Sequence, residues 1–336
     1  MSAIIVAELS ANHNGNIKNA IETIKAAKRA GADAIKFQTY TAETMTLNSH
    51  MSDFKITQGT LWDGQYLYDL YQKAYTPWEW HDELFRVARE EGILCFSTPF
   101  DKTAVDFLET LRNPIYKIAS FEITDISLIE YAAKKMKPMI ISTGIAMLED
   151  IELAVNTCRS VGNNNVTLLK CTSSYPAPIE DANLCMIPDL ARRFTVKSGL
   201  SDHTLGSISA ITAIALGATM VEKHFIIDRS MGGPDAAFSM NEEEFKQMVK
   251  DIRDVEKSIG EIRYELTDKM KVGREFSRSL YIAEDIKEGD VLTTQNVKSV
   301  RPGYGLHPKF LKDVIGKKVN QDLKKGMRLD WGYIVQ

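Results

Sequence analysis

The sequence predicts a (β/α)8 TIM barrel followed by a small C-terminal β-rich domain. Eight short apolar runs alternate with helical segments over the first 260 residues, and short strands with turns replace that pattern beyond residue 276. Strands that alternate with helices form parallel sheets, and eight such units in about 250 residues match the size of this barrel. A doubly wound open sheet is disfavoured, because the turn after the first run reads ELSANHNG and has no GxGxxG pattern.

The eight expected barrel strands are rich in β-branched and other apolar residues, a composition that favours strands. In chain order, between residues 3 and 225, they read AIIVAEL, DAIKFQT, ILCFST, IYKIAS, PMIIST, VTLLKCT, FTVKSGLS and ATMVEKHF.

Three of the intervening helices have clear signals. Residues 16–31 repeat isoleucine along one face and end at Gly31, which suits the position after a helix C-terminus. Residues 206–218 repeat this form and end near Gly217. Residues 240–260 begin with three glutamates, which are favourable at the positive end of a helix dipole.

The change of pattern gives the expected domain boundaries. Residues 1–260 form the barrel domain, the charged residues 261–275 form a linker, and residues 276–336 form the second domain. About sixty residues make a marginal core, so we expect the second domain to dock on another surface.

Composition excludes several function classes. The net charge of −4 provides no cationic field for nucleic acid or anionic lipid. No run of 18 apolar residues predicts a membrane span, and the N-terminus lacks the basic start of a signal peptide. We expect a cytoplasmic protein with reduced thiols, because the cysteines form neither a CxxC nor a zinc-ligand spacing; they are Cys95, Cys158, Cys171 and Cys185.

The predicted strands end in polar side chains, and the carboxyl ends of the strands form the active-site face of such a barrel. One convergent polar pocket is therefore expected there. In chain order its candidate residues are Glu8, Lys36, Gln38, Ser97, Thr98, Lys117, Ser120, Glu122, Ser142, Thr143, Lys170, Thr172, Ser173, Tyr175, Ser201, Asp202, His203, Glu222, Lys223 and His224.

Two of the six histidines end the last two strands. Neighbouring strands lie about 5 Å apart, so His203 and His224 at matching heights can share one ion. Imidazoles with nearby carboxylates suit Mn²⁺, Fe²⁺, Co²⁺ or Zn²⁺. The alternative is that each imidazole only makes structural hydrogen bonds.

Lysines end three separate strands beside hydroxyl groups. Such a set predicts an anion clamp for phosphate or carboxylate. Lysines that extend to solvent, or one Schiff-base lysine, are the alternatives. The lysines are Lys36, Lys117 and Lys170, and the neighbouring hydroxyls are those of Ser120, Ser142 and Ser173.

Two loops offer further candidates. The turn at residues 232–234 can point Asp235 into the pocket, or Asp235 can lie in an exposed turn. In the second domain, Arg301 lies on a Pro-Gly turn and can be either a surface arginine or a lid over a pocket.

These motifs resemble the sialic acid synthase family along essentially the whole chain. The barrel motifs are AELSANHNG, AIKFQTY, FSTPF, YKIASFE, ISTGIA, KCTSSYP, GLSDHTLG, VEKHF and GPDAAFSM, and RPGYGLHP resembles the family's antifreeze-like (SAF) domain. The aromatic-rich segment 62–80 is most similar to the family's pseudaminic acid branch. The resemblance implies condensation of phosphoenolpyruvate with an N-acetylated amino sugar to a nine-carbon 2-keto acid. For this branch the sugar is 2,4-diacetamido-2,4,6-trideoxy-β-L-altropyranose.

The resemblance also implies roles for residues. It assigns a divalent metal, usually Mn²⁺ with Mg²⁺ or Co²⁺ as alternatives, to His203 and His224, with Glu8 nearby. Glu122 and Glu222 match acidic residues at the reacting centre. The positions that match phosphoenolpyruvate contacts are Lys36, Lys117, Ser120, Ser142 and Ser201, and those that match sugar contacts are Gln38, Tyr175 and Asp235. Thr98 lies in the matching strand-three motif, and Ser173 stands at a further substrate-binding position.

The second domain carries the implied contacts to a partner. Arg301 matches an arginine that reaches the neighbouring subunit's site in a domain-swapped homodimer, although the linker also permits docking within one chain. Phe276 matches an aromatic lid residue, whereas Arg278 replaces a second aromatic residue. Ser173 replaces an asparagine of the sialic branch.

Three other functions stay open at this point. The acceptor can be N-acetylmannosamine, which would make the product sialic acid. The barrel can be a Schiff-base aldolase, or the chain can be a sugar sensor with an inactive barrel.

Overall fold

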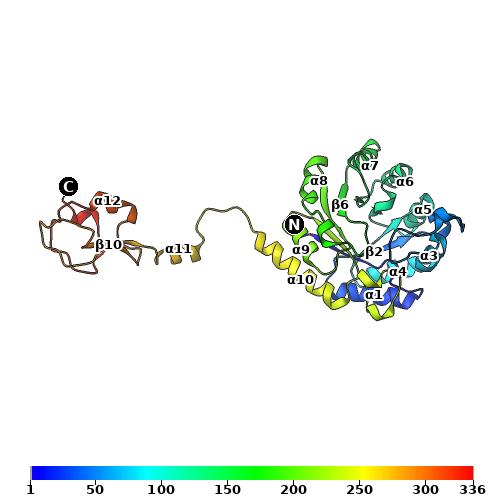
Figure 1. Cartoon of the computed structure of the whole chain (residues 1–336), viewed down its shortest axis with the longest axis horizontal. Helices are drawn as coiled ribbons and strands as arrows, with labels where there is room; N and C mark the ends of the chain where they lie inside the picture. The colour runs from blue at the N-terminus through cyan, green and yellow to red at the C-terminus, as the bar shows by residue number, and fades with distance from the viewer. Residues whose placement is uncertain (1, 336) are drawn as a thin grey trace. The chain divides into compact units, whose positions relative to one another are not determined.

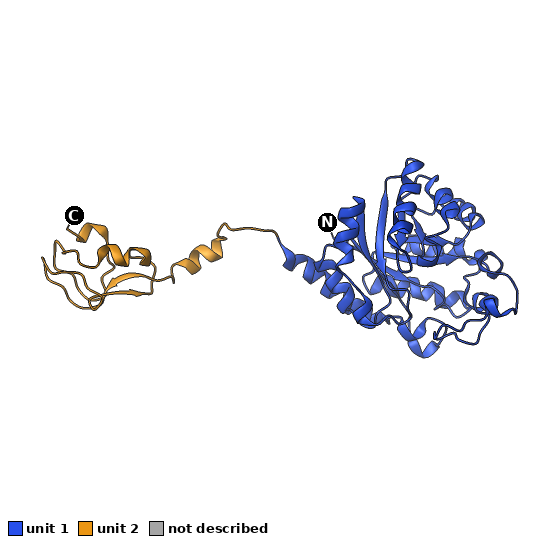
Figure 2. Cartoon of the chain, turned by 45° about the horizontal axis from the view of Figure 1, so that its top comes forward, with its two compact units in different colours: residues 1–260 blue, residues 261–336 orange. Residues whose placement is uncertain are grey.

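The computed structural model describes residues 2–335 and divides into two compact units, residues 1–260 and 261–336. Figure 2 shows the two units in different colours. Each has its own buried apolar cluster.

The first unit is a closed barrel of eight parallel strands in sequential order. Each strand pairs with the next one along the chain, and β1 closes the barrel against β8. The predicted TIM barrel is therefore confirmed. The strands are β1 (Ile4–Glu8), β2 (Ala34–Thr39), β3 (Leu94–Pro99), β4 (Tyr116–Ile118), β5 (Met139–Ser142), β6 (Val166–Cys171), β7 (Lys197–Asp202) and β8 (Met220–His224).

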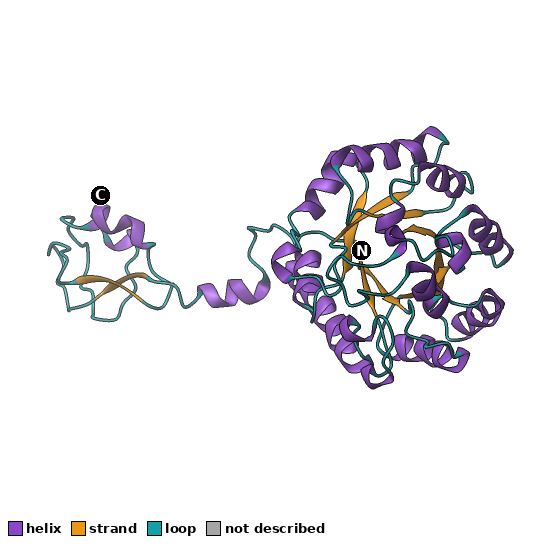
Figure 3. Cartoon of the chain, turned by 45° about the vertical axis from the view of Figure 1, so that its right-hand side comes forward, coloured by secondary structure: helices purple, strands orange, loops and turns teal. Residues whose placement is uncertain are grey.

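Helices surround the strands (Figure 3). They are α1 (Ile17–Arg29), α4 (His81–Glu90), α5 (Lys102–Thr110), α6 (Ile126–Ala133), α7 (Leu148–Ser160), α8 (Met186–Phe194), α9 (Ile208–Ala215) and α10 (Glu242–Ile259), labelled in part in Figure 1. The three helices predicted from clear signals are present, each within the predicted limits.

Local sequence explains where these helices begin. The side chain of Asn16 accepts a hydrogen bond from the backbone N–H of Lys18 at the start of α1. At α10, Asn241 and Glu244 form a reciprocal capping box.

The interior of the barrel changes from apolar to polar along its axis. One apolar layer inside the strands consists of Val6, Ala34, Phe96, Ile140, Leu169 and Met220. Side chains alternate between the two faces of a strand, so the next inward positions, two residues further along, lie above this layer. That step brings Glu8, Lys36 and Glu222 into the interior.

The longest connection in the barrel joins β2 to α4. It contains α2 (Ala42–Met45), two short 3-10 turns and α3 (Leu67–Ala74). Apolar residues of this connection line the pocket described below.

The second unit is turn-rich, as predicted. It contains α11 (Asp268–Arg274), the antiparallel pair β9 (Ser279–Ile282) and β10 (Val297–Val300), and α12 (Leu311–Val314). Within the expected linker, α11 is a difference from the prediction. The hydroxyl of Thr267 caps it, and the helix continues through Gly273.

Among residues 2–335, no helix combines the length and the apolar character that crossing a membrane requires.

Candidate active site

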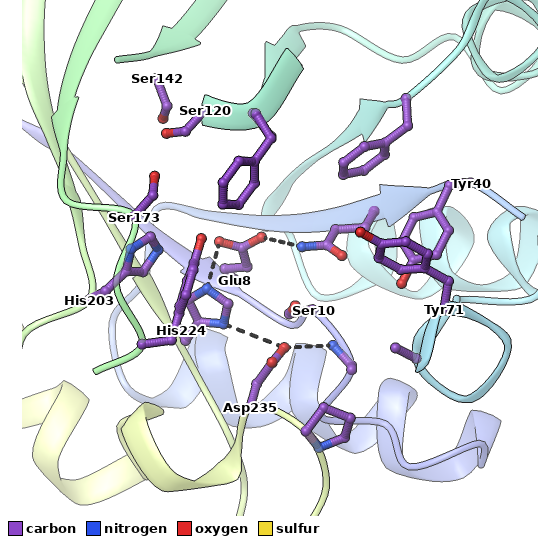
Figure 4. A pocket seen from close by; sticks show the side chains of 18 of the residues that line it. Glu8, Ser10, Tyr40, Tyr71, Ser120, Ser142, Ser173, His203, His224 and Asp235 are labelled. Atoms are coloured by element: carbon purple, nitrogen blue, oxygen red, sulfur yellow. Dashed lines mark hydrogen bonds and ion pairs between the residues drawn. The ribbon is translucent and has the colours of Figure 1, made fainter. Parts of the chain in front are cut away.

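A cavity of about 510 Å³ opens at the carboxyl ends of the barrel strands. Its size is typical of small-molecule sites. The residues predicted from strand ends that line it are Glu8, Lys36, Gln38, Lys117, Ser120, Glu122, Ser142, Ser173, Tyr175, Ser201, His203, Glu222, His224 and Asp235. Figure 4 shows part of this pocket.

A buried ion network forms the floor of the pocket. Lys36 Nζ lies 2.5 Å from Glu8 Oε1 and 3.5 Å from Glu222 Oε1, and Lys117 Nζ lies 3.2 Å from the same oxygen of Glu222. Ser201 Oγ donates to that oxygen at 3.3 Å. Because opposite charges alternate, each buried ion has a partner that offsets its desolvation.

The network sets the charge of its members. Burial alone would raise the pKa of Glu8, but Lys36, His224 and Lys117 hold it well below the usual range. Burial would lower the pKa of Lys36, but Glu222 and Glu8 raise it. Lys36 is therefore a protonated ammonium that suits anion binding. This argues against it as a Schiff-base nucleophile, which needs a neutral amine.

Seven of the residues predicted from strand ends lie outside the pocket lining: Ser97, Thr98, Thr143, Lys170, Thr172, Asp202 and Lys223. Thr98 is buried beneath Lys36 and accepts from its Nζ at 3.3 Å, so it supports the lysine. Lys170 follows the inward Leu169 and precedes Cys171, which lines the pocket; strand alternation therefore turns it away. Its Nζ donates to the carbonyl of Cys171. Placing Lys170 in the clamp was wrong.

Serine hydroxyls converge on one side of the pocket. Figure 4 shows Ser120, Ser142 and Ser173 near one another. Gly144 makes this possible, since a Cβ there would lie 2.1 Å from Ser173 Oγ and 2.8 Å from Ser120 Oγ. Ser142 Oγ is buried without a hydrogen-bond partner among residues 2–335, so it is available to a ligand.

The two histidines lie side by side at the ends of the neighbouring strands β7 and β8. Their ring centroids lie 5.3 Å apart. His203 Nδ1 lies 2.9 Å from the carbonyl oxygen of Thr172 and must donate a hydrogen bond to it. In the neutral ring, Nε2 therefore holds the lone pair. His224 Nε2 lies 3.4 Å from Glu8 Oε2, and its Nδ1 lies 3.8 Å from Asp235 Oδ2.

Electrostatics differ between the two rings. Burial lowers the pKa of His224 against the opposing effect of Glu8 and Asp235, which favours the neutral, metal-binding form. Burial also disfavours the charged form of His203, but Cys171 outweighs it and raises the pKa of His203 to about 9. A metal ion at this ring would displace that proton.

The residues present fit a divalent cation. A metal–nitrogen bond is about 2.0–2.1 Å, and rings 5.3 Å apart can reach one ion. Four carboxyl groups and only two lysines line the pocket, so a cation would balance the charge. Within residues 2–335, no three His, Cys, Asp or Glu side chains are placed to hold a metal by themselves. Water and substrate oxygens would therefore complete the shell around His203 and His224.

Glu122 is the pocket's candidate acid or base. Burial, opposed by Lys117, raises the pKa of Glu122 to about 7. Its Oε2 has no hydrogen-bond partner among the described residues. A carboxyl group that titrates near neutral pH can both take and give a proton.

The predicted sugar contacts lie beside the histidines. The Tyr175 ring is 4.4 Å from His203 by centroid. Gln38 donates to Glu8 Oε1 at 3.0 Å. Asp235 is 8% exposed, and its Oδ2 accepts a hydrogen bond from the backbone N–H of Ala11 at 3.3 Å. Of the two predicted alternatives, the structure therefore shows the carboxylate that points into the pocket, not the exposed turn.

Sequence reasoning missed part of the lining. Tyr40 follows Gln38 by two residues on the same strand-end motif, and strand parity could have found it. Tyr71 lies on α3, and Phe100 lies just after β3. Cys171, expected in the core, also lines the pocket.

Phe276 and Arg301 lie in the second unit. Phe276 is 65% exposed. Arg301 is exposed, and none of the residues 2–335 forms an ion pair with it.

Comparison with known proteins identifies the barrel unit. Residues 23–264 match the NeuB family, and residues 277–332 match the SAF domain. This chain belongs to the NeuB family. The match covers more than half of the chain, so the resemblance to a family of sialic acid synthases with an antifreeze-like domain is confirmed.

Relatives within the NeuB family include two named pseudaminic acid synthases. The protein from Helicobacter pylori is 51% identical over 321 residues, which cover 95% of this chain and 94% of that protein. The protein from Campylobacter jejuni is 48% identical over 328 residues, covering 98% and 95%. The crystal structure of the N-acetylneuraminic acid synthetase of Leptospira borgpetersenii aligns with a TM-score of 0.73 at 30% identity, over 81% of this chain and 90% of that one.

Proposed function

We propose that this protein condenses phosphoenolpyruvate with 2,4-diacetamido-2,4,6-trideoxy-β-L-altropyranose to a nine-carbon 2-keto acid and phosphate. It would thus be a transferase with the activity named for its H. pylori and C. jejuni relatives. The observation that carries the proposal is the 48–51% identity to those pseudaminic acid synthases over nearly the whole chain. The pocket supports it, because it combines an anion-binding side with paired histidines.

Phosphoenolpyruvate would bind at the lysines and serines. The ammonium groups of Lys36 and Lys117 would face its negative charges, and the free hydroxyl of Ser142 would donate to an oxygen. The remaining hydroxyls of this clamp are those of Ser120, Ser173 and Ser201. Because these groups are buried and fixed, they hold C3 of the enol against the acceptor, a gain from positioning.

The acceptor would react as its open-chain aldehyde beside His203 and His224. A divalent metal at these residues, with Glu8 alongside, would supply Lewis-acid polarisation of the aldehyde carbonyl. Mn²⁺ is the ion we propose, with Mg²⁺ and Co²⁺ as alternatives. Gln38, Tyr175 and Asp235 would orient the sugar.

The reaction closes with water. A bond forms between C3 of phosphoenolpyruvate and C1 of the sugar, and the former carbonyl oxygen takes a proton. Glu122, whose pKa is about 7, would take a proton from water as it adds to C2. Glu222 is the second candidate for this step. The C–O bond to phosphate then breaks, which leaves the keto group and inorganic phosphate.

We further propose a cytoplasmic homodimer in which the second unit of one chain covers the site of its partner. The exposed and unpaired guanidinium of Arg301 would add positive charge to a carboxylate-rich pocket, and the exposed Phe276 would contact the sugar. Arg301→Ala should then raise the KM for substrate in every subunit. Mixing it with a His224→Ala chain should restore some activity only if the site is shared between chains.

The test is phosphate release from phosphoenolpyruvate with each of two sugars, with the product mass measured. We expect turnover with the diacetamido sugar and little with N-acetylmannosamine, the acceptor that would make the product sialic acid. The reverse preference would refute the proposed acceptor. A second test uses phosphoenolpyruvate labelled with ¹⁸O at the oxygen that joins C2 to phosphorus. The label should appear in the released phosphate, and label retained in the keto acid would mean that the P–O bond breaks instead.

Metal removal gives a separate test. EDTA should abolish turnover and Mn²⁺ should restore it, whereas His224→Ala should bind Mn²⁺ more weakly by calorimetry. Full activity of metal-free protein would remove the metal from the scheme.

A further inference from the structure

The side of the pocket away from the serines is apolar and aromatic. Six residues form this wall: Tyr40, Met45, Ile56, Leu70, Tyr71 and Phe100. Five of them belong to the connection between β2 and α4, whereas Phe100 follows β3. The two tyrosines and Phe100 pack edge to face. The Tyr40 ring lies 5.8 Å from Tyr71 and 5.1 Å from Phe100 by centroid. We call these six residues the aromatic wall.

The connection that carries the wall is fixed across the pocket. Trp62 Nε1 lies 3.3 Å from the carbonyl of Pro234, on the loop after β8. The Trp62 ring lies 5.6 Å from that of Tyr175, which lies in turn 4.4 Å from His203. The wall is therefore held in place relative to the histidines.

Two hydroxyl groups interrupt the apolar surface. Neither Tyr40 Oη nor Tyr71 Oη has a hydrogen-bond partner among residues 2–335, and Tyr40 is only 4% exposed. Burial raises the pKa of both tyrosines, with the further effect of Asp235 on Tyr40 and of Glu122 on Tyr71. Both are therefore neutral O–H donors in the pocket lining, where an oxygen of a ligand can accept a hydrogen bond from them.

This combination matches an acetamido group beside a methyl carbon. The carbonyl oxygen of an amide accepts from a tyrosine hydroxyl, while its methyl group packs against aromatic and aliphatic carbon. An apolar surface also favours a CH3 terminus over CH2OH, because a hydroxyl there would lose its hydrogen bonds to water.

The position of the wall indicates which end of the sugar it meets. Figure 4 shows Ser120, Ser142 and Ser173 on one side, Tyr40 and Tyr71 on the other, and Glu8 between them. An acceptor whose aldehyde lies at the histidines next to phosphoenolpyruvate must extend its distal carbons away from the serines, toward the tyrosines.

We propose that the aromatic wall is the subsite for the 4-acetamido group and the 6-deoxy methyl carbon of the acceptor. It would select this sugar over one with hydroxyls at C4 and C6. This inference rests on the function proposed above and assigns that choice to Tyr40, Tyr71 and Met45.

The experiment compares kcat/KM for three acceptors at saturating phosphoenolpyruvate. They are the diacetamido trideoxy sugar, its counterpart with the 6-hydroxyl restored, and N-acetylmannosamine. For the unaltered protein we expect the first to exceed the second by about 10–100-fold, the range in which an apolar pocket rejects an added hydroxyl.

The variants change single groups of the wall. Tyr40→Phe/Tyr71→Phe should lower kcat/KM for the diacetamido sugar by at least 10-fold, with the KM for phosphoenolpyruvate within two-fold of the unaltered value. Met45→Gln, which keeps the side-chain length, should shrink the preference for the 6-deoxy sugar about five-fold. Matched controls from the same connection are Tyr68→Phe, at a half-buried residue whose hydroxyl bonds to Glu43, and Leu47→Gln, at an exposed residue; both lie outside the pocket lining.

The outcomes separate the two proposals. If the unaltered protein uses the diacetamido sugar but the wall variants keep its selectivity, or lose phosphoenolpyruvate affinity equally, the subsite is overturned and the function stands. If the unaltered protein uses N-acetylmannosamine alone, the acceptor assignment and the subsite both fall. Near-ultraviolet circular dichroism of each variant checks its fold.

Discussion

A second buried ion pair lies behind the histidines, on the face of β7 and β8 that points away from the pocket. Lys223 Nζ donates to Asp202 Oδ2 at 2.7 Å and to the carbonyl of Thr204 at 2.6 Å. Asp202 Oδ1 accepts from the N–H and the hydroxyl of Thr204 at 2.9 and 2.7 Å. The pair therefore ties the residues on both sides of His203 to the residue before His224.

Lys223→Met would remove the cation and leave the carboxylate of Asp202 in the interior. Both side chains are 1% exposed, so water cannot replace the lost partner. Breaking a pair buried to this extent costs about 3–5 kcal/mol of unfolding free energy. Asp202→Asn/Lys223→Met removes both charges and keeps an acceptor for Thr204. We expect it to be less destabilised than the sum of the single changes by about 1–3 kcal/mol.

Urea denaturation followed by tryptophan fluorescence measures these differences. Three of the four tryptophans, Trp62, Trp78 and Trp80, lie in the barrel unit, so the signal reports mainly on its unfolding. Lys257→Met is the matched control, since its pair with Asp254 is exposed and should contribute less than about 1 kcal/mol. A Lys223→Met protein as stable as this control would refute the reasoning.

Three further changes probe the pocket and its support. Gly144→Ala should raise the KM for phosphoenolpyruvate at least 10-fold without unfolding the protein, because the new Cβ would lie 2.1 Å from Ser173 Oγ. The pH profile of kcat/KM should change near pH 7, where Glu122 titrates, and Glu122→Gln should lose that step. Because the folded protein holds this proton between pH 4.5 and about 7 and the unfolded chain does not, stability should fall as pH rises through that window, and Glu122→Gln should flatten the fall. Burial lowers the pKa of His81 to about 4, so its contribution is present above pH 6.5 and is lost as pH falls toward 4; His81→Gln should reduce this acid sensitivity in thermal unfolding.

The barrel and the location of its pocket could be predicted because both depend on short-range periodicity. Eight apolar runs separated by helical segments fix the order of strands, and the polar residue that ends each run must lie at the active-site face. The approach of His203 and His224 follows from the pairing of the last two strands. Their distance and the contact with Glu8 needed the closure of β1 against β8.

Other features could not be found in that way. Lys170 was misplaced because the sequence shows where a strand ends but not which of its alternating side chains point into the barrel. That choice is settled only when the inward layer, which includes Leu169, is known. Tyr71 lies on α3, 32 residues after β2 ends at Thr39. No local sequence pattern indicates that a residue so far along the chain reaches the pocket. The helix α11 depends on a cap at Thr267, which the charge pattern of the linker concealed.

The distribution of unpaired polar atoms separates function from folding in this barrel. Six buried polar side-chain atoms have no hydrogen-bond partner among residues 2–335, and four of them belong to pocket residues: Glu122, Ser142, Glu222 and His224. Each such atom costs about 1–3 kcal/mol, so folding alone gives no reason to gather them in one place. Ligands that complete these bonds should therefore stabilise the barrel. Phosphoenolpyruvate with Mn²⁺ should raise the melting temperature by several degrees, and pyruvate, which lacks the phosphate, should raise it less. Equal shifts from the two ligands would mean that the unpaired groups at the serine side do not bind phosphate.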